Sequence, residues 1–347
     1  MPAEVSIFAP IDHYLAEVQE KNVSRCWHAG EDDDLSRLTA EIERLNINIL
    51  MIQFNYGFFN LEKFAQFLIK QVSDDRVVVI TLHSTTDPTH EPNKKLENIA
   101  QALRACRRIL VHSIDDLNRL KLLGITENVA CFPHGVPEYD LALDEPRKIS
   151  KQDSFTIASY GFFLPHKGLI ELIKAVLLLK ESGKNVRLKM VNAEYPAPES
   201  EKLIQKVKRL IRDNNLDESV ELHTDYLEDV ESFKILASAD LLVFPYQVTG
   251  ESSSAAVRYG IATGQPVAVT PLAIFEDVST VVHKLPGTTP TEIADGISEI
   301  ISELYLKTNA VSTLASAGVQ WRKEHNYARI GQRMGNLLKS LWLNRSF

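Results

Sequence analysis

The chain has 347 residues, of which 44% are apolar, and this length allows two cores of ordinary domain size. Its net charge of -8 gives no general attraction to nucleic acid. The three cysteines are odd in number and lack C-x-x-C spacing, which argues against a disulfide framework and a zinc site. No apolar run approaches the roughly 18 residues of a membrane span, and no signal peptide is visible at Met1. We therefore expect a soluble, cytoplasmic protein.

The first part of the chain alternates between strand and helix patterns. A strand is predicted at residues 5–9 and is closed by Pro10. The further strands are predicted at residues 49–54, 77–82, 109–112 and 129–132, and the helices between them at 61–70, 96–106 and 114–123. This alternation predicts a parallel sheet covered on both faces. Ligands bind beyond the carboxyl ends of such strands, so Tyr56, Gly57 and His83 are site candidates.

A run of acids at residues 31–34 could be mistaken for an Asp-x-Asp metal site. Metal-binding carboxylates need to converge at the end of a strand, whereas this run is followed directly by an amphipathic helix pattern at residues 35–40. An acidic helix start explains the run more simply, and we expect no metal site.

A charged segment without apolar periodicity, residues 138–154, is interpreted as an interdomain linker. It follows the turn of residues 133–137, in which Gly135 is expected to supply a positive φ. The alternation then resumes, with strands predicted at residues 155–161, 186–191, 220–223, 241–245 and 267–269 and helices at 169–179, 201–214, 230–238, 290–304, 311–324 and 327–343.

The chain is organised around residues 240–270, which read as strand, polar loop, helix and strand. The serines Ser252, Ser253 and Ser254 stand directly before good helix formers, as at a helix start, while Gly264 and Pro266 end the helix. A helix start at this edge of a sheet offers free N–H groups and a positive dipole end to an anion. We expect a phosphate-bearing ligand here.

The spacing of this stretch resembles the donor-binding segment of retaining glycosyltransferases of family 4. That pattern has an acid, a helix with a second Glu eight residues later, and Gly-x-Pro-Val. Glu251 matches the first acid and residues 264–267 match the end. The segment after residue 161 resembles the family's diphosphate loop, with Lys167 at the position of its lysine. Residues 80–84, ITLHS, resemble the segment in which a histidine, here His83, reaches the transferred sugar.

Two positions depart from the family pattern. Phe162 stands where the family has the diphosphate-binding Arg, and either His166 or Arg258 is a candidate substitute. Tyr259 stands where the family's second Glu accepts hydrogen bonds from the ribose, and a phenol offers only one oxygen. Structural roles also stay open for two of these residues: Lys167 could be a solvated surface lysine, and His83 could cap the following loop.

The resemblance covers nearly the whole chain and implies an α/β protein of GT-B fold, with two Rossmann-like domains facing across a cleft. It implies an acceptor domain at residues 1–137, a nucleotide-sugar domain at 155–325 and a C-terminal helix at 326–347 that returns to the first domain. The family has a strand and a glycine-rich loop before the equivalent of residues 4–10, so the first βα unit is suspected to be absent.

The resemblance also implies site roles. The catalytic candidates are Lys167, Glu251 and His83. The donor-binding candidates are Gly161, Phe162, His166, Asn192, Tyr226, Leu227, Ser252, Ser253, Ser254, Ala255 and Tyr259. The acceptor-side candidates are Tyr56, Gly57 and His134.

The expected function is metal-independent, retaining transfer of a hexose from a UDP-sugar or GDP-sugar to a glycan or lipid-linked saccharide, as in polysaccharide biosynthesis. No cofactor is expected, and a lipid-linked acceptor would be reached peripherally, at the inner face of a membrane. Two alternatives stay open: a non-catalytic GT-B protein that binds nucleotide or glycan and assembles with a true transferase, and a nucleotide-sugar epimerase. A phosphorylase would need a pyridoxal phosphate lysine or a second phosphate site, and no such motif is seen.

Overall fold

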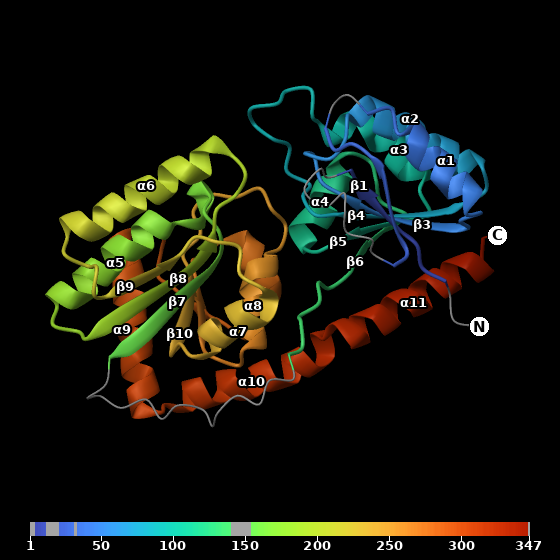
Figure 1. The fold of residues 1–347 in the computed structure, drawn as a ribbon. Helices are drawn as coiled ribbons and strands as arrows, with labels where there is room; N and C mark the ends of the chain where they lie inside the picture. The colour runs from blue at the N-terminus through green and yellow to red at the C-terminus, as the bar shows by residue number, and fades with distance from the viewer. Residues whose placement is uncertain (1–3, 12–20, 31–32, 140–153, 346–347) are drawn as a thin grey trace. The chain divides into compact units, whose positions relative to one another are not determined.

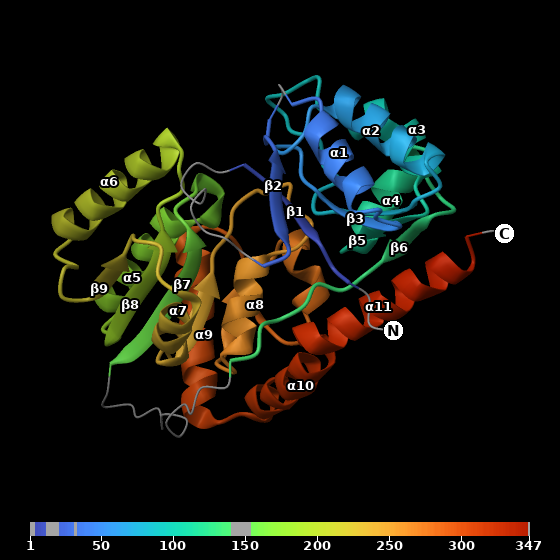
Figure 2. The ribbon, with the colours of Figure 1, turned by 45° about the vertical axis from the view of Figure 1, so that its right-hand side comes forward.

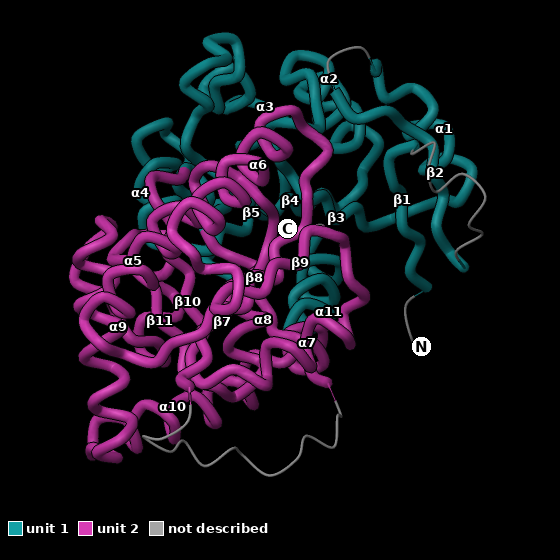
Figure 3. Tube along the Cα trace, turned by 60° about the vertical axis from the view of Figure 1, so that its left-hand side comes forward, with its two compact units in different colours: residues 1–132, 250–252, 333–347 teal, residues 133–249, 253–332 magenta. Residues whose placement is uncertain are grey.

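The computed structural model describes residues 4–11, 21–30, 33–139 and 154–345 (Figure 1). Most of the expected linker, residues 138–154, therefore lies outside the described residues, as do residues 31 and 32 of the acidic run. The chain divides into two compact units, coloured separately in Figure 3. Unit 1 comprises residues 1–132, 250–252 and 333–347, and unit 2 comprises residues 133–249 and 253–332.

Unit 1 contains a four-stranded parallel sheet in the order β3-β4-β5-β6. Its strands are β3 (Ile49–Phe54), β4 (Val77–Leu82), β5 (Arg108–Val111) and β6 (Val129–Cys131). Its helices are α1 (Ser36–Arg44), α2 (Leu61–Ser73), η1 (Leu96–Ile99), α3 (Ala100–Ala105) and α4 (Ile114–Leu122). The predicted strands and helices are thus present, with the helix expected at residues 96–106 beginning as a 3₁₀ turn.

The β4 strand is buried throughout, and all of its residues except Thr81 are apolar, because both of its faces are covered. Val78, Ile80 and Leu82 belong to the main core with helices α1 to α4. Val77 and Val79 alternate with them and point to the other face, where Leu341 of α11 (Tyr327–Leu343) packs. Side chains alternate along a strand, so a continuous apolar run serves two cores at once.

One element of unit 1, strand β2, is not foreseen by the sequence patterns. The strand β1 (Ile7–Pro10) includes Pro10 and pairs in parallel with β2 (Val23–Trp27), and the two form a separate sheet. In Figure 2 this pair stands to the left of β3, β5 and β6.

Unit 2 contains a six-stranded sheet in the order β12-β11-β10-β7-β8-β9, and each of its pairs is parallel. Its strands are β7 (Phe155–Phe162), β8 (Val186–Ala193), β9 (Val220–His223), β10 (Leu241–Phe244), β11 (Val267–Val269) and β12 (His283–Lys284). Its helices are η2 (Pro165–Lys167), α5 (Leu169–Glu181), α6 (Pro198–Asp213), α7 (Asp229–Ala237), α8 (Ala255–Ala262), η3 (Ala273–Val278), α9 (Pro290–Leu306) and α10 (Asn309–His325).

The two faces of this sheet carry separate cores, and the helices that cover them are labelled in Figure 1. Helices α5, α6 and α9 pack on one face, and α7, α8 and η3 pack on the other. Strand β7 is central: β8 and β9 follow it on one side, and β10, β11 and β12 lie on its other side. This reversal of strand order between β7 and β10 is the place where α/β sheets bind ligands.

The expectation that Gly135 adopts a positive φ is wrong, because Gly135 is not among the glycines with positive φ. The position needs glycine for space. An added Cβ would lie 2.4 Å from the ring of Tyr327, while neighbouring Val136 pairs with Asn326 as an isolated bridge.

Candidate functional site

The Lys167 loop is held tightly against the end of β10. Lys167 ends the short helix η2, and Gly168 follows with φ +68°. A Cβ on Gly168 would lie 1.8 Å from the carbonyl oxygen of Pro245. The backbone N–H of Gln247 donates to the carbonyl of His166 at 2.8 Å. Lys167 is only 8% exposed, which excludes the alternative of a solvated surface lysine.

The start of α8 is anchored by its own side chains. Ser254 is the N-cap residue, and its Oγ accepts from the N–H of Val257 at 3.3 Å. The guanidinium of Arg258 donates to the Ser254 carbonyl at 2.8 Å and to the Asp277 carboxylate. Arg258 is 2% exposed, and burial lowers its pKa while Asp277 opposes the change. Arg258 thus holds the start of α8 from its buried side.

Tyr246 contacts both Lys167 and the N-cap of α8, and the sequence analysis does not single it out. The Lys167 Nζ lies 4.0 Å from the centroid of the Tyr246 ring. The Tyr246 hydroxyl lies 3.1 Å from Ser254 Oγ, and the whole residue is 1% exposed. One aromatic side chain therefore touches both the ammonium group after β7 and the cap of the helix after β10. The sequence carries only a weak signal for this role, an aromatic residue directly after the strand.

Several other donor-binding candidates lie at the same edge of the unit 2 sheet. Gly161 has φ +129°, and a Cβ added to it would lie 3.6 Å from the Cβ of Ala256. Asn192 is 1% exposed at the end of β8, and its Oδ1 accepts from Ser159 Oγ at 2.7 Å. Ser253 Oγ donates to Asp277 at 3.2 Å, and Ala255 is the first residue of α8.

Phe162 stands in an aromatic group instead of a charged one. Its ring centroid lies 5.3 Å from that of Tyr195 and 6.4 Å from that of Tyr226. Tyr226 is 76% exposed, whereas Leu227 packs partly into the core beside α7. The position expected to carry an arginine is therefore part of an exposed aromatic surface.

Tyr259 is engaged with other tyrosines and one acid. Its hydroxyl donates to Asp229 Oδ2 at 3.3 Å, and its ring lies 5.1 Å from that of Tyr160. Burial is the main cause that raises the pKa of Tyr259, and a hydrogen bond with Tyr139 adds to it. The phenol is neutral at physiological pH, and the carboxylate nearest to it is that of Asp229.

In unit 1, His83 is paired with a second histidine. His83 Nδ1 lies 3.3 Å from His112 Nε2, and His83 Nε2 lies 2.7 Å from Gln53 Oε1. His112 Nδ1 donates to the Phe132 carbonyl at 3.0 Å. Burial, and then His112, lower the pKa of His83 to about 4, so His83 is neutral at pH 7. Its side chain points to these partners, which speaks against a simple cap of the following loop.

The segment carrying Glu251 lies beside His83. The backbone N–H of Ser252 donates to the His83 carbonyl at 3.2 Å, and the Glu251 side chain is exposed. Residues 250–252 belong to unit 1. The structure therefore brings two of the three catalytic candidates together within this unit, while Lys167 belongs to unit 2.

The acceptor-side candidates have separate surroundings. Tyr56 is 6% exposed and donates to Asp87 Oδ1 at 2.7 Å. Gly57 is exposed, and its N–H donates to Asn55 Oδ1 at 3.0 Å. His134 lies in unit 2, with Nδ1 3.3 Å from the carbonyl oxygen of Gly135. A hollow in unit 1 lies near Asn60, Glu62 and Lys94 and is lined by none of these candidates.

The acidic run behaves as a helix start where it is described. Asp33 Oδ1 accepts from the N–H of Leu35 at 2.6 Å, and Asp34 Oδ1 accepts from that of Ser36 at 2.9 Å. Ser36 is the first residue of α1. These two carboxylates therefore bind backbone amides at the beginning of the helix.

Several solved structures share the fold of this chain over most of its length. HepE from Anabaena, crystallised with UDP, matches with a TM-score of 0.71 at 15% identity, covering 92% of this chain and 86% of HepE. Sucrose-phosphate synthase from Thermosynechococcus elongatus matches with 0.67 at 16% identity, covering 89% and 77%. A UDP-forming α,α-trehalose-phosphate synthase from Burkholderia xenovorans matches with 0.67 at 12% identity, covering 87% and 76%.

The fold is GT-B. Within it, residues 154–303 match the family model described as glycosyl transferases group 1. No curated protein matches the chain by sequence. Among the helices of the described residues, none is both long and apolar enough to cross a membrane.

Proposed function

We propose that the protein is a retaining glycosyltransferase that moves a hexose from a nucleotide-diphosphate sugar to a saccharide acceptor. The observation that carries this proposal is the contact of Tyr246 with both Lys167 and the Ser254 cap. A buried ammonium group and a helix start at one point of the sheet edge suit a diphosphate. The match of residues 154–303 to glycosyl transferases group 1 supports the same assignment.

The donor lies on unit 2, with its diphosphate between Lys167 and the amides that begin α8. Uracil is the first base to test, because HepE was crystallised with UDP and with UDP-glucose. The exposed ring of Tyr226 beside Phe162 offers a stacking surface to a base. Asp229, which accepts from Tyr259, is the carboxylate that replaces the expected ribose-binding Glu.

The reaction breaks the bond between the anomeric carbon and the diphosphate oxygen. The sugar becomes oxocarbenium-like while negative charge grows on the departing diphosphate, where Lys167 and the helix start stabilise it. The acceptor oxygen then bonds to the anomeric carbon on the same face, and its proton passes to the departing diphosphate. Retention of configuration follows from attack on that face.

The remaining two catalytic candidates act on the sugar. Glu251 accepts a hydrogen bond from a sugar hydroxyl instead of acting as a nucleophile. Neutral His83 contacts the transferred sugar without adding charge to it. Because the ammonium group and the helix dipole neutralise the leaving group, we propose that neither metal nor cofactor takes part.

The acceptor is proposed to be a glycan or a lipid-linked saccharide, the latter reached from the cytoplasmic surface of a membrane. Tyr56, Gly57 and His134 stay the candidates on the acceptor side. The replacement of two family residues by Phe162 and Tyr259 favours one alternative, a non-catalytic protein that binds nucleotide or glycan.

Calorimetric titration with UDP, GDP and a panel of their sugars, followed by donor hydrolysis assays, tests the proposal. We expect binding of one nucleotide series and slow donor hydrolysis that Glu251→Ala lowers at least tenfold. Binding of no nucleotide would support the non-catalytic alternative. Interconversion of the donor sugar without its release would identify an epimerase.

A further inference from the structure

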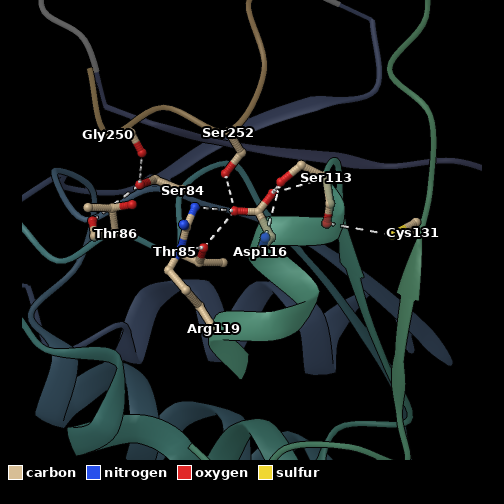
Figure 4. A network of polar contacts seen from close by, with 9 residues as sticks. All are labelled: Ser84, Thr85, Thr86, Ser113, Asp116, Arg119, Cys131, Gly250 and Ser252. Atoms are coloured by element: carbon tan, nitrogen blue, oxygen red, sulfur yellow. Dashed lines mark hydrogen bonds and ion pairs between the residues drawn. The ribbon is translucent and has the colours of Figure 1, made fainter. Parts of the chain in front are cut away.

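The residues on both sides of Glu251 are tied to the rest of unit 1 by three hydrogen bonds, and Figure 4 draws the two that involve the Gly250 carbonyl and Ser252 Oγ. Ser84 Oγ donates to the Gly250 carbonyl at 2.7 Å. The Ser252 N–H donates to the His83 carbonyl at 3.2 Å, and Ser252 Oγ donates to Asp116 Oδ1 at 2.7 Å. Residues 250–252 are thus fastened to the loop after β4 and to the start of α4, all within unit 1.

Asp116 is the centre of this network. Its side chain is fully buried and accepts five hydrogen bonds, from Thr85 Oγ1, Ser252 Oγ, Arg119 Nη2, Ser113 N and Ser113 Oγ. The bonds from Ser113 are part of the capping box that begins α4. Bonds to a carboxylate are stronger than neutral ones, and a buried acceptor that loses its donor is costly.

We propose that Asp116 is a positioning residue that, through Ser252, fixes the backbone of Glu251 and so the place of its carboxylate. The inference rests on the proposed function, because it takes Glu251 to contact the transferred sugar. The capping box at the start of α4 fixes the position of the Asp116 side chain. Asp116 in turn holds Ser252 by a hydrogen bond, and Ser252 directly follows Glu251 in the sequence. A displacement of about 1 Å at a catalytic group can lower a rate by about 100-fold.

Two variants separate positioning from stability. Ser252→Ala and Thr85→Val each remove one hydroxyl from the same oxygen of Asp116, and both residues are 5% exposed. Thr85→Val also removes the acceptor of Arg119 Nε, so we expect it to lower the melting temperature at least as much as Ser252→Ala does. Only Ser252→Ala should lower kcat, by about tenfold with little change in the KM for the donor, whereas Thr85→Val should stay within about twofold of the wild type. Equal kcat values for the two variants would overturn the proposal.

A double-mutant cycle tests the route through Glu251. If Asp116 and Ser252 act by holding Glu251, then Ser252→Ala should have almost no further effect on turnover in a Glu251→Ala background, since coupled residues are not additive. A tenfold loss in both backgrounds would show that Ser252 acts elsewhere, and the proposal would fall.

The positioning claim can fail separately from the proposed function. Hydrogen–deuterium exchange of the amides at residues 250–253 needs no substrate, and Ser252→Ala should accelerate it at least tenfold over Thr85→Val. Accelerated exchange without any donor turnover would keep the anchor and remove the transferase. Turnover that requires Glu251, with unchanged exchange in Ser252→Ala, would keep the transferase and remove the anchor.

Discussion

The position of Lys167 is set by a ring face and a tight turn. Its ammonium group lies over Tyr246, whose hydroxyl in turn contacts the cap of α8. A cation over an aromatic ring contributes about 0.5 to 2 kcal/mol, enough to hold a long side chain in one region. The charge is therefore held close to the helix start before any anion arrives.

Lys167→Met should lower turnover at least tenfold, because it removes the cation while keeping a side chain of similar length. Loss of one donor to developing charge costs about 3 kcal/mol, or roughly a hundredfold. Steady-state kinetics with the bound UDP-sugar or GDP-sugar measures this. Lys234→Met is the control, since Lys234 is an exposed lysine of α7 in the same unit. Equal rates for the two variants would remove Lys167 from the site.

His83 should make the protein less stable in mild acid. Its pKa is lowered from 6.5 to about 4 in the folded state, first by burial and then by His112. Between these values the unfolded chain binds a proton that the folded chain does not, so stability falls as pH falls from about 6.5 to about 4. After allowance for partial exposure we expect a loss on the order of 1 to 2 kcal/mol.

Thermal unfolding at pH 7 and pH 4.5 measures this effect, and His83→Gln should reduce the difference between the two pH values. His283 has a pKa lowered mainly by burial, so His283→Gln should remove a separate contribution that adds to the first. A His83→Gln protein with the full wild-type pH dependence would contradict the assignment.

The sequence predicts some site residues and misses others for a definable reason. Ser254 and Lys167 lie in local patterns, a helix cap and a loop between strand and helix, and these are readable from neighbouring residues. Asp116 looks only like the third residue of a capping box, because its partner Ser252 is remote in sequence. Tyr246 and His112 likewise obtain their roles from contacts that arise only in the folded chain.

Elements with a local signal were predicted closely. Strand β4 is apolar except for Thr81, and the start of α9 has Thr289 with Glu292 as a capping box, so both have clear boundaries. Strand β2, with Arg25 between Ser24 and Cys26, has no apolar alternation and was missed. Its pairing with β1 arises only in the folded chain and has no signal in the sequence of β2.

The turn between η2 and α5 should not tolerate a side chain at Gly168. Gly168→Ala adds both the strain of positive φ and a clash with the Pro245 carbonyl, so we expect a loss of about 2 to 4 kcal/mol. Denaturant unfolding measures it. Gly183→Ala is a matched control, because Gly183 has φ +85° but open space around its Cβ, and about 1 kcal/mol is expected there. Equal costs would mean that the loop can move away from β10.

For the molecule as a whole, transfer should proceed without a divalent cation. The charge that grows on the diphosphate is assigned to Lys167 and the α8 start, so incubation with EDTA should change the rate by less than about twofold. Direct chromatography of the released nucleotide avoids coupling enzymes that need magnesium. Loss of activity that added Mg²⁺ or Mn²⁺ restores would contradict this.

The two-unit organisation also affects how the chain folds during synthesis. Val77, Val79 and Leu110 form one face of the first sheet, and Leu341 near the other end of the sequence covers them. A ribosome must therefore complete the intervening unit before the earlier sheet acquires its cover. Until then the nascent polypeptide exposes this apolar face of the sheet, which chaperones can bind and through which chains can aggregate.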